Sequence, residues 1–334
     1  MATHSSIGYG SGVRQVSMSG RSFPFPGEYV GELAACADDP RDPGAVPALR
    51  AGLQRDGYLL LRGFADREAV LATRRTLLAR MADDGWLAPD DEPLAGRSNP
   101  GRRGAPSVDS QQPAVAGFYR EQPFLPFFER YFGEPAMIYP KILTRVKNTG
   151  GRTGVHFDNV YIGRGSPRLL SCWMPWGDVT ADQGPLAICS GSHNLPSFAR
   201  LRDTYGRHDP DRDYIKGADN AAGHFSFDLH EVTERFGGRW LTADFRAGDV
   251  LVFPPFTMHC ALENTTGRFR ISSDTRFQPA ADATDPRFMT NLEPRQALRH
   301  RYRVADGEVA ALTMDEARAK WGLEATAPAR RGPG

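Results

Sequence analysis

The sequence predicts a mainly β fold, preceded by two helices and contained in one large domain. Two observations predict it: strand-like segments closed by turn residues recur in the second half of the chain, and helix-like segments precede them. The length of 334 residues allows one large or two small domains, and a hydrophobic content of 40% is enough for a core. Because all-β domains often reach this length as single units, we expect one decorated domain over residues 28–324.

The N-terminal part contains the expected helices. Residues 1–27 are rich in Gly and Ser, and we expect them, like the tail 325–334, to be mobile. A helix is predicted near residues 47–55, then a strand over residues 58–62, and then a helix over about 66–82. The second helix has an apolar stripe made by Val70, Leu71, Leu77, Leu78 and Met81. These elements are expected to pack against the core.

A strand is predicted over residues 155–162, which are rich in β-branched and aromatic residues and end at Gly163. Successive side chains of a strand point to opposite faces, so His156 and Asp158 would share one face while Phe157 points the other way. Two residues of this kind can reach one ion. A His-x-Asp pair occurs easily by chance, however, so its context must decide.

Two further strands follow. Residues 250–253 read as a short buried strand between a turn at Gly248-Asp249 and the break at Pro254-Pro255, and His259 comes after that bend. Residues 268–277 alternate: Arg268, Arg270, Ser272, Asp274 and Arg276 fall on one face, and Phe269, Ile271 and Phe277 fall on the other. A face of arginines can bind an anion, or it can be the solvated face of a half-buried sheet.

His156, Asp158 and His259 together make a two-histidine, one-carboxylate set. If they meet in space, they can hold a metal on one side and leave the opposite positions open, as in non-haem Fe(II) oxygenases. The sequence therefore predicts an oxidative metal centre.

A series of short motifs in the second half of the chain resembles the phytanoyl-CoA dioxygenase family of Fe(II)/2-oxoglutarate-dependent oxygenases. The match spans roughly residues 140–280, which we take as the core of the domain, and each motif alone is weak. In chain order the motifs are His156-Phe157-Asp158-x-x-Tyr161, Leu170-Ser171-Cys172-Trp173, Gln183-Gly184-Pro185-Leu186, Gly191-Ser192-His193, Gly248-Asp249-Val250, His259 and Arg270.

The resemblance implies a double-stranded β-helix, a jelly-roll or cupin-like barrel, with the N-terminal helices against its outside. It implies iron held by His156, Asp158 and His259, and 2-oxoglutarate and O2 as cosubstrates. It also implies that Arg270 pairs with the C5 carboxylate of 2-oxoglutarate. Arginine suits this role because its planar guanidinium meets a carboxylate with two parallel hydrogen bonds.

The alternation alone cannot choose Arg270 over Arg268 or Arg276, since all three share a face; only the family spacing chooses it. Two further residues are expected near the cosubstrate. The hydroxyl of Ser272 can add a donor to the same carboxylate. Trp173 falls where the family packs an aromatic ring, although a core aromatic in a buried strand is nearly as good a reading.

The activity implied is oxidation of an unactivated C–H bond of a small molecule, most simply hydroxylation, with release of succinate and CO2. Tailoring of a secondary metabolite is one such role. Related halogenases carry a small residue in place of the carboxylate ligand, and Asp158 therefore favours hydroxylation. Relatives often have a polar residue at position 157, where Phe157 instead suggests an apolar wall of the pocket.

Two other functions use the same three residues. A zinc-dependent hydrolase also accepts two histidines and a carboxylate with an open fourth position. A non-catalytic ligand-binding barrel is the third reading, because fold does not determine function. Arg270 counts against both.

Substrate contacts are harder to assign. Lys147, Asn159, Tyr161 and Trp176 lie near the His-x-Asp strand in the sequence and are candidates for the pocket mouth. Two long insertions, residues 87–117 and 196–239, could supply lids or further contacts. The second insertion holds His208, His224 and His230, each of which is better read singly as an ordinary surface histidine, while His193 is better read as structural.

Composition limits the partners. A formal net charge of +1, with no basic block standing apart from acids, argues against nucleic acid. No apolar stretch could span a bilayer and the polar N-terminal segment lacks the parts of a signal peptide, so we expect no membrane partner and a cytoplasmic enzyme. The four cysteines are expected to be free thiols. The sequence gives neither the substrate nor the oligomeric state.

Overall fold

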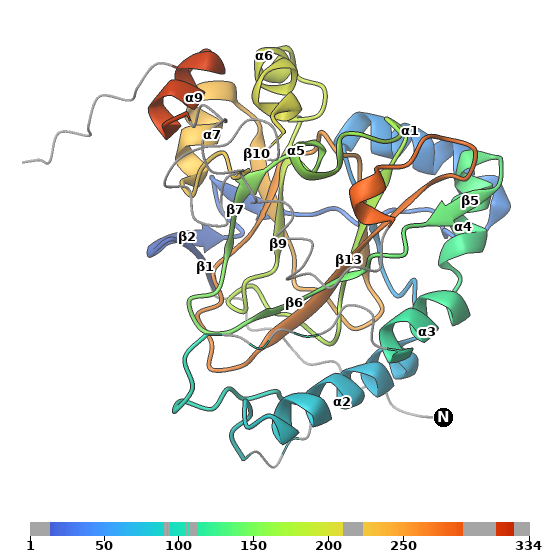
Figure 1. Cartoon of the computed structure of the whole chain (residues 1–334), viewed down its shortest axis with the longest axis vertical. Helices are drawn as coiled ribbons and strands as arrows, with labels where there is room; N and C mark the ends of the chain where they lie inside the picture. Colours follow the sequence, from blue (N-terminus) through green and yellow to red (C-terminus); the bar gives the residue numbers. More distant parts are fainter. Residues whose placement is uncertain are drawn as a thin grey trace, which may run out of the picture.

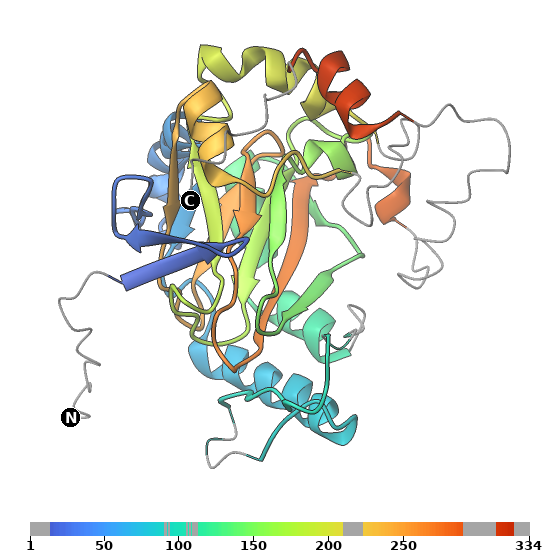
Figure 2. The ribbon, with the colours of Figure 1, turned by 90° about the vertical axis from the view of Figure 1, so that its left-hand side faces the viewer.

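Two β-sheets face each other in the computed structural model, and helices cover their outer faces (Figures 1 and 2). The structure describes residues 14–89, 92, 94–104, 106, 108, 113–209, 223–289 and 312–323. Apart from the parallel pair β3–β10, the strand pairs within the two sheets are antiparallel. The predicted mainly β, double-stranded β-helix fold with N-terminal helices is confirmed.

The larger sheet has the strand order β4-β11-β8-β13-β5, and β6 also pairs with β13. Its strands are β4 (Leu59–Leu61), β5 (Ala136–Ile138), β6 (Leu143–Lys147), β8 (Leu170–Pro175), β11 (Val250–Phe253) and β13 (Arg270–Pro279). The smaller sheet has the order β3-β10-β9-β12-β7. Its strands are β3 (Val30–Glu32), β7 (Thr153–His156), β9 (Leu186–Ser190), β10 (Arg239–Thr242) and β12 (His259–Ala261).

Helices lie on both outer faces. The α-helices are α1 (Val46–Asp56), α2 (Arg67–Asp83), α3 (Pro113–Glu121), α4 (Phe124–Phe132), α5 (Asn159–Ile162), α6 (Ala199–Asp203), α7 (Leu229–Phe236) and α9 (Met314–Lys320). Short 3₁₀ turns are η1 (Pro43–Ala45), η2 (Pro196–Phe198), η3 (Tyr205–Arg207) and η4 (Pro286–Phe288). No described helix combines the length and the apolar character that crossing a membrane requires.

The two helices predicted before the barrel are confirmed as α1 and α2. The side chain of Asp66 caps α2 by accepting a hydrogen bond from the Ala69 backbone N–H. Val70, Leu77 and Met81 are buried and belong to one core cluster with residues of α1, α3, α4 and the outer face of the larger sheet. The helices therefore bury their apolar stripes against that sheet.

Strand alternation sorts the residues of the larger sheet. On β13, Ile271 and Phe277 face outward and pack with the helices. Arg270, Ser272 and Arg276 lie on the opposite face, which looks into the space between the sheets, and all three are buried. The predicted alternation is confirmed for residues 270–277, whose polar face is an interior face rather than a solvated one. Arg268 precedes β13, and its side chain is 49% exposed.

The prediction that residues 1–27 are mobile is wrong for residues 14–25. These residues form a hairpin of β1 (Arg14–Met18) and β2 (Arg21–Phe25). Every second side chain is apolar, and Val16, Met18, Phe23 and Phe25 are buried in the cluster that covers the smaller sheet. Residues 1–13 and the predicted tail 325–334 lie outside the described residues.

Candidate metal and cosubstrate site

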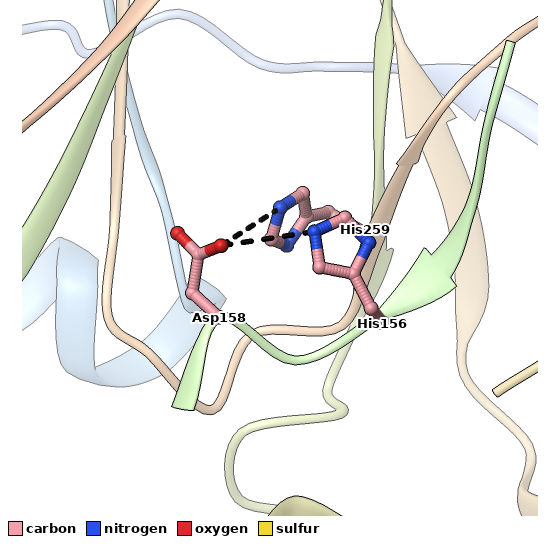
Figure 3. A group of neighbouring side chains, drawn as sticks. All are labelled: His156, Asp158 and His259. Atoms are coloured by element: carbon pink, nitrogen blue, oxygen red, sulfur yellow. Dashed lines mark ion pairs between the residues drawn. The ribbon is translucent and has the colours of Figure 1, made fainter. Parts of the chain in front are cut away.

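His156, Asp158 and His259 come together between the two sheets (Figure 3). His156 is the last residue of β7 and His259 the first residue of β12, and the two are register partners across the strand pair. Asp158 lies just after β7, where the chain turns into α5. The strand predicted over residues 155–162 thus ends early, and residues 159–162 are helical. Two ligands still share a face because the turn begins only after Phe157.

The three side chains offer donor atoms that lie within 4.8 Å of one another. Nε2 of His156 and Nε2 of His259 each lie 3.7 Å from Oδ1 of Asp158. All three residues are buried, with exposed fractions of 6%, 3% and 4%. Three converging donors of this kind can hold one metal ion on one side and leave its other side open.

Backbone carbonyls orient both imidazoles. Nδ1 of His156 lies 2.8 Å from the Gly154 carbonyl oxygen, and Nδ1 of His259 lies 2.9 Å from that of Thr257. A carbonyl can only accept, so Nδ1 carries the proton and donates it in each case. Nε2 therefore presents a lone pair to the centre. Burial, and next the neighbouring His156, lower the pKa of His259 to about 4, so its ring is neutral near pH 7.

Oδ2, the second oxygen of Asp158, has protein partners. The Ser171 hydroxyl donates to it, and Nη2 of Arg276 donates to it at 3.0 Å. Burial alone would raise the pKa of Asp158, but the Arg276 guanidinium favours the charged form, and the pKa lies well below its usual value. The carboxylate is therefore charged, with Oδ1 left for a metal. Sequence reasoning missed the roles of Ser171 and Arg276.

The guanidinium of Arg270 is buried, and some of its N–H donors have no partner. It is 1% exposed, and its Nη1 donates to the Ser272 hydroxyl oxygen at 2.6 Å. Its Nε and Nη2 are buried and have no hydrogen-bond partner. The guanidinium carbon lies 6.0 Å from the Trp173 ring centre. Burial lowers the pKa of Arg270 to about 10, which still leaves it charged near neutrality. Buried charged donors without partners indicate a place for an anion.

The surroundings of Arg268, Arg270 and Arg276 differ in the structure, although strand alternation alone could not distinguish them. Arg268 has a side chain that is 49% exposed and lies 3.6 Å from Glu92. Arg276 is committed to Asp158. Of the three, Arg270 alone has no carboxylate within ion-pair distance among the described residues, and its Nε and Nη2 are buried without a partner.

The residues predicted at the pocket mouth divide into two groups. Lys147 lies on the inner face of β6, opposite Arg270 in the strand register. The Tyr161 ring lies 5.4 Å from the His156 ring. Both therefore remain candidates. Asn159 is used otherwise, since its amide donates to the Gly206 carbonyl at 2.7 Å and joins α5 to η3.

The prediction that Phe157 and Trp176 line the pocket is wrong. Phe157 is 0% exposed and packs against Tyr205 and Phe256, because it points to the side of its strand opposite His156. Trp176 is 0% exposed and packs against Phe118, because Cys172, Met174 and Trp176 alternate toward the helices. Both residues were assigned to the pocket because they are near the His-x-Asp pair in sequence. The alternation of side chains along their strands turns them away from it.

One histidine of the second insertion reaches the site. The His224 ring lies 5.5 Å from the His156 ring. The prediction that these are surface histidines is also wrong for His208, which is buried and packs near Trp321. His230 packs against Phe23 and Tyr29. The predicted structural role of His193 is confirmed, since its Nε2 lies 2.9 Å from the Gln54 carbonyl oxygen. Residues 210–222 of this insertion lie outside the described residues.

The first insertion, in its described part, covers the turns at the Arg270 end of the sheets. The Ser98 N–H donates to the Gly267 carbonyl at 2.8 Å, and the Asn148 amide donates to the Gly104 carbonyl. The four cysteines are free thiols, as predicted.

Comparisons with known proteins agree with this geometry. A family model described as phytanoyl-CoA dioxygenase (PhyH) matches residues 53–272, which is more than half of the chain. A 1-deoxypentalenic acid 11-beta-hydroxylase of Streptomyces arenae is 26% identical over 238 residues, covering 67% of this chain and 78% of the relative.

Solved structures share the fold. The epimerase SnoN, in complex with Fe3+, alpha ketoglutarate and nogalamycin RO, has a TM-score of 0.50 and 23% identity, covering 73% of this chain and 88% of its own. The apoform of EctD from S. alaskensis has a TM-score of 0.50 and 17% identity, covering 85% and 90%.

The side chains present fit what the family requires. Two imidazole Nε2 atoms and one carboxylate oxygen suit Fe(II), and the unpartnered Nε and Nη2 of Arg270 suit the far carboxylate of 2-oxoglutarate. The chain belongs to the phytanoyl-CoA dioxygenase family and is an Fe(II)- and 2-oxoglutarate-dependent oxygenase.

Proposed function

We propose that this oxygenase hydroxylates an unactivated C–H bond of a small molecule, with Fe(II) held by His156, Asp158 and His259. The observation that carries the proposal is Arg270, a fully buried guanidinium with two unpartnered donor atoms in a chain that also holds an intact triad. We propose that it binds the C5 carboxylate of 2-oxoglutarate, with Ser272 beside it and Trp173 packing along the cosubstrate.

The protein's own residues do three things in this reaction. The Gly154 and Thr257 carbonyls hold the imidazoles in the tautomer that binds metal. Ser171 and Arg276 hold Oδ2 of Asp158, so that Oδ1 alone faces the metal. Arg270 anchors one end of the cosubstrate and thereby aligns its other end with the triad. When bound, Fe(II) lets 2-oxoglutarate and O2 oxidise a C–H bond to C–OH, releasing succinate and CO2.

Two observations favour hydroxylation within the family. Asp158 occupies the position where halogenating relatives carry a small residue, so a halide has no vacant coordination position to take. The relative from Streptomyces arenae is named as a hydroxylase of a small organic acid. A small-molecule substrate and a role in tailoring a secondary metabolite are proposed on the same basis.

An anaerobic titration tests the proposal. Adding Fe(II) and then 2-oxoglutarate to the purified protein should produce the weak visible metal-to-ligand charge-transfer band of a 2-oxoglutarate chelate. On admitting O2, slow succinate formation should follow even without substrate, and it should be absent in His156→Ala. Full succinate formation by His156→Ala would reject the assignment of the metal ligands.

A zinc hydrolase remains the contrasting function. It would use the same triad with water in the fourth position. Arg270 does not support it, because hydrolysis needs no sealed anchor for a dicarboxylate. The same titration distinguishes the two: a hydrolase gives no band with Fe(II) and 2-oxoglutarate, and its activity survives without O2.

Ser171→Ala should weaken Fe(II) binding about tenfold, within the range found for partners of metal ligands. The Ser171 hydroxyl donates to Oδ2 of Asp158, and without it the carboxylate can rotate away from the metal position. Equilibrium competition with a chromogenic chelator measures the affinity. Ser273→Ala is the matched control: this buried serine lies on the outer face of β13 and bonds Tyr119. Equal Fe(II) affinity in the Ser171→Ala protein and the wild type would contradict the role.

A further inference from the structure

The inner face of β6 carries cations that the proposed mechanism does not use. Arg145 and Lys147 are both on this face, opposite Ser272 and Arg270 of β13 in the strand register. Together with Arg270 and Arg276 they place four cations along the polar part of the space between the sheets.

Two of these cations have carboxylate partners. Nε of Arg145 donates to Asp274, and Nη2 of Arg276 donates to Asp158. Arg270 has none and is assigned to the cosubstrate. Lys147 also has no carboxylate within ion-pair distance among the described residues; its Nζ donates to the Arg152 carbonyl at 2.9 Å. An ammonium has three donors, so two remain for a ligand.

The four cations differ in how far they are exposed to solvent. The Arg270 residue is 1% exposed, and the Arg276 side chain is 5% exposed. The Arg145 side chain, beside Lys147 on β6, is 40% exposed, and Lys147 itself is only half-buried. The cations on β6 are therefore more accessible to solvent than those on β13.

His224 borders the same side. Its ring lies 5.5 Å from that of His156, and a Cβ at Gly154 would lie 2.9 Å from its Cγ, so the imidazole occupies the space that the glycine leaves. Nδ1 of His224 is buried and has no hydrogen-bond partner. An unpartnered buried ring nitrogen beside a metal-ligand histidine can serve as a hydrogen-bonding group for a ligand.

We propose that Lys147 and His224 bind a carboxylate of the substrate, at a position separate from the cosubstrate carboxylate at Arg270, and that the substrate is therefore an organic acid. The inference rests on the proposed function, since it takes the Arg270 position to be filled by 2-oxoglutarate. Lys147 supplies the charge, and His224 supplies a hydrogen bond on the side nearest the metal.

The electrostatics of the region are consistent with an anion there. Burial, then Arg270 and Arg145, lower the pKa of Lys147 to about 7. A charged ammonium among arginines is disfavoured in the absence of a counter-ion, and a bound carboxylate removes that cost. The same neighbours repel a cationic substrate.

The test uses pairs of alicyclic monocarboxylates and their primary amides, beginning with cyclohexanecarboxylate and cyclohexanecarboxamide, as probes. Calorimetry measures their binding to the metal-free protein and to the anaerobic Fe(II)/2-oxoglutarate complex. We expect the wild type to bind acids about tenfold tighter than amides, as one charge-assisted hydrogen bond provides. Lys147→Met should remove that preference, Lys147→Arg should retain most of it, and the Kd for 2-oxoglutarate should change less than twofold.

Lys320→Met, on the outer helix α9, is the matched control for the loss of one lysine charge. His224→Phe should weaken acid binding while leaving the Lys147 side chain in place. Two outcomes overturn the inference: equal binding of acids and amides by the wild type, or a Lys147→Met protein whose 2-oxoglutarate affinity falls while its acid preference remains. Failure of the proposed function shows itself separately, as a missing charge-transfer band in the wild type.

Discussion

Arg270→Met should raise the Kd for 2-oxoglutarate about a hundredfold, which corresponds to roughly 2.7 kcal/mol. The variant removes a buried guanidinium with two unpartnered donors and leaves a dicarboxylate to be buried without a counter-charge. Arg270→Lys should recover little of the affinity, because an ammonium cannot make two parallel hydrogen bonds from this position. Fe(II) binding should stay near that of the wild type, since Arg270 contacts none of the three ligands in the structure.

The charge-transfer band gives the 2-oxoglutarate affinity directly, and chelator competition gives the Fe(II) affinity. Arg268→Met is the matched control, since Arg268 belongs to the same alternating series but lies at the surface near Glu92. A large loss of 2-oxoglutarate affinity in Arg268→Met, with none in Arg270→Met, would move the anchor to the other arginine.

Asp158→Ala should strongly weaken Fe(II) binding and also lower the free energy of unfolding by about 3–5 kcal/mol. The second effect follows from Arg276, whose buried guanidinium would lose the carboxylate that lies 3.0 Å from it. In the double variant Asp158→Ala/Arg276→Met, the uncompensated charge is gone as well. We expect that protein to recover most of the lost stability and none of the metal binding.

Urea unfolding of the metal-free proteins measures the stability, so that bound iron does not enter the comparison. The single variant Arg276→Met completes the double-mutant cycle and gives the coupling between the two residues. If Asp158→Ala is as stable as the wild type, the buried ion pair does not contribute as proposed. If the double variant binds Fe(II) like the wild type, Asp158 is not a ligand.

Local pattern predicted the metal site because the chemistry follows strand geometry. Alternation placed His156 and Asp158 on one side of the chain, and the break at Pro254-Pro255 brought His259 to the start of a new strand. The same rule predicted a face of arginines on β13. It could not say which arginine lacks a partner, because that depends on Asp158 and Glu92, which are distant in sequence.

The errors have physical reasons too. Trp176 was assigned by nearness to the His-x-Asp strand, but parity along β8 turns it toward the helices. Residues 159–162 look like a strand by composition, yet they form a helical turn after Asp158. The hairpin of residues 14–25 was hidden by its Gly- and Ser-rich surroundings. His224 lies in an insertion without periodicity, so nothing in the sequence placed it near His156.

The edge position of β6 has a consequence for how such enzymes diversify. Among the residues that the structure describes, this strand pairs with β13 alone, whereas β13 also pairs with β8 and β5. Exchanging the side chains that β6 turns inward would alter which molecule is accepted and leave the residues around the iron and the diacid undisturbed. Selection for new chemistry on new compounds can then proceed one inward-facing position at a time, without rebuilding the oxidising centre.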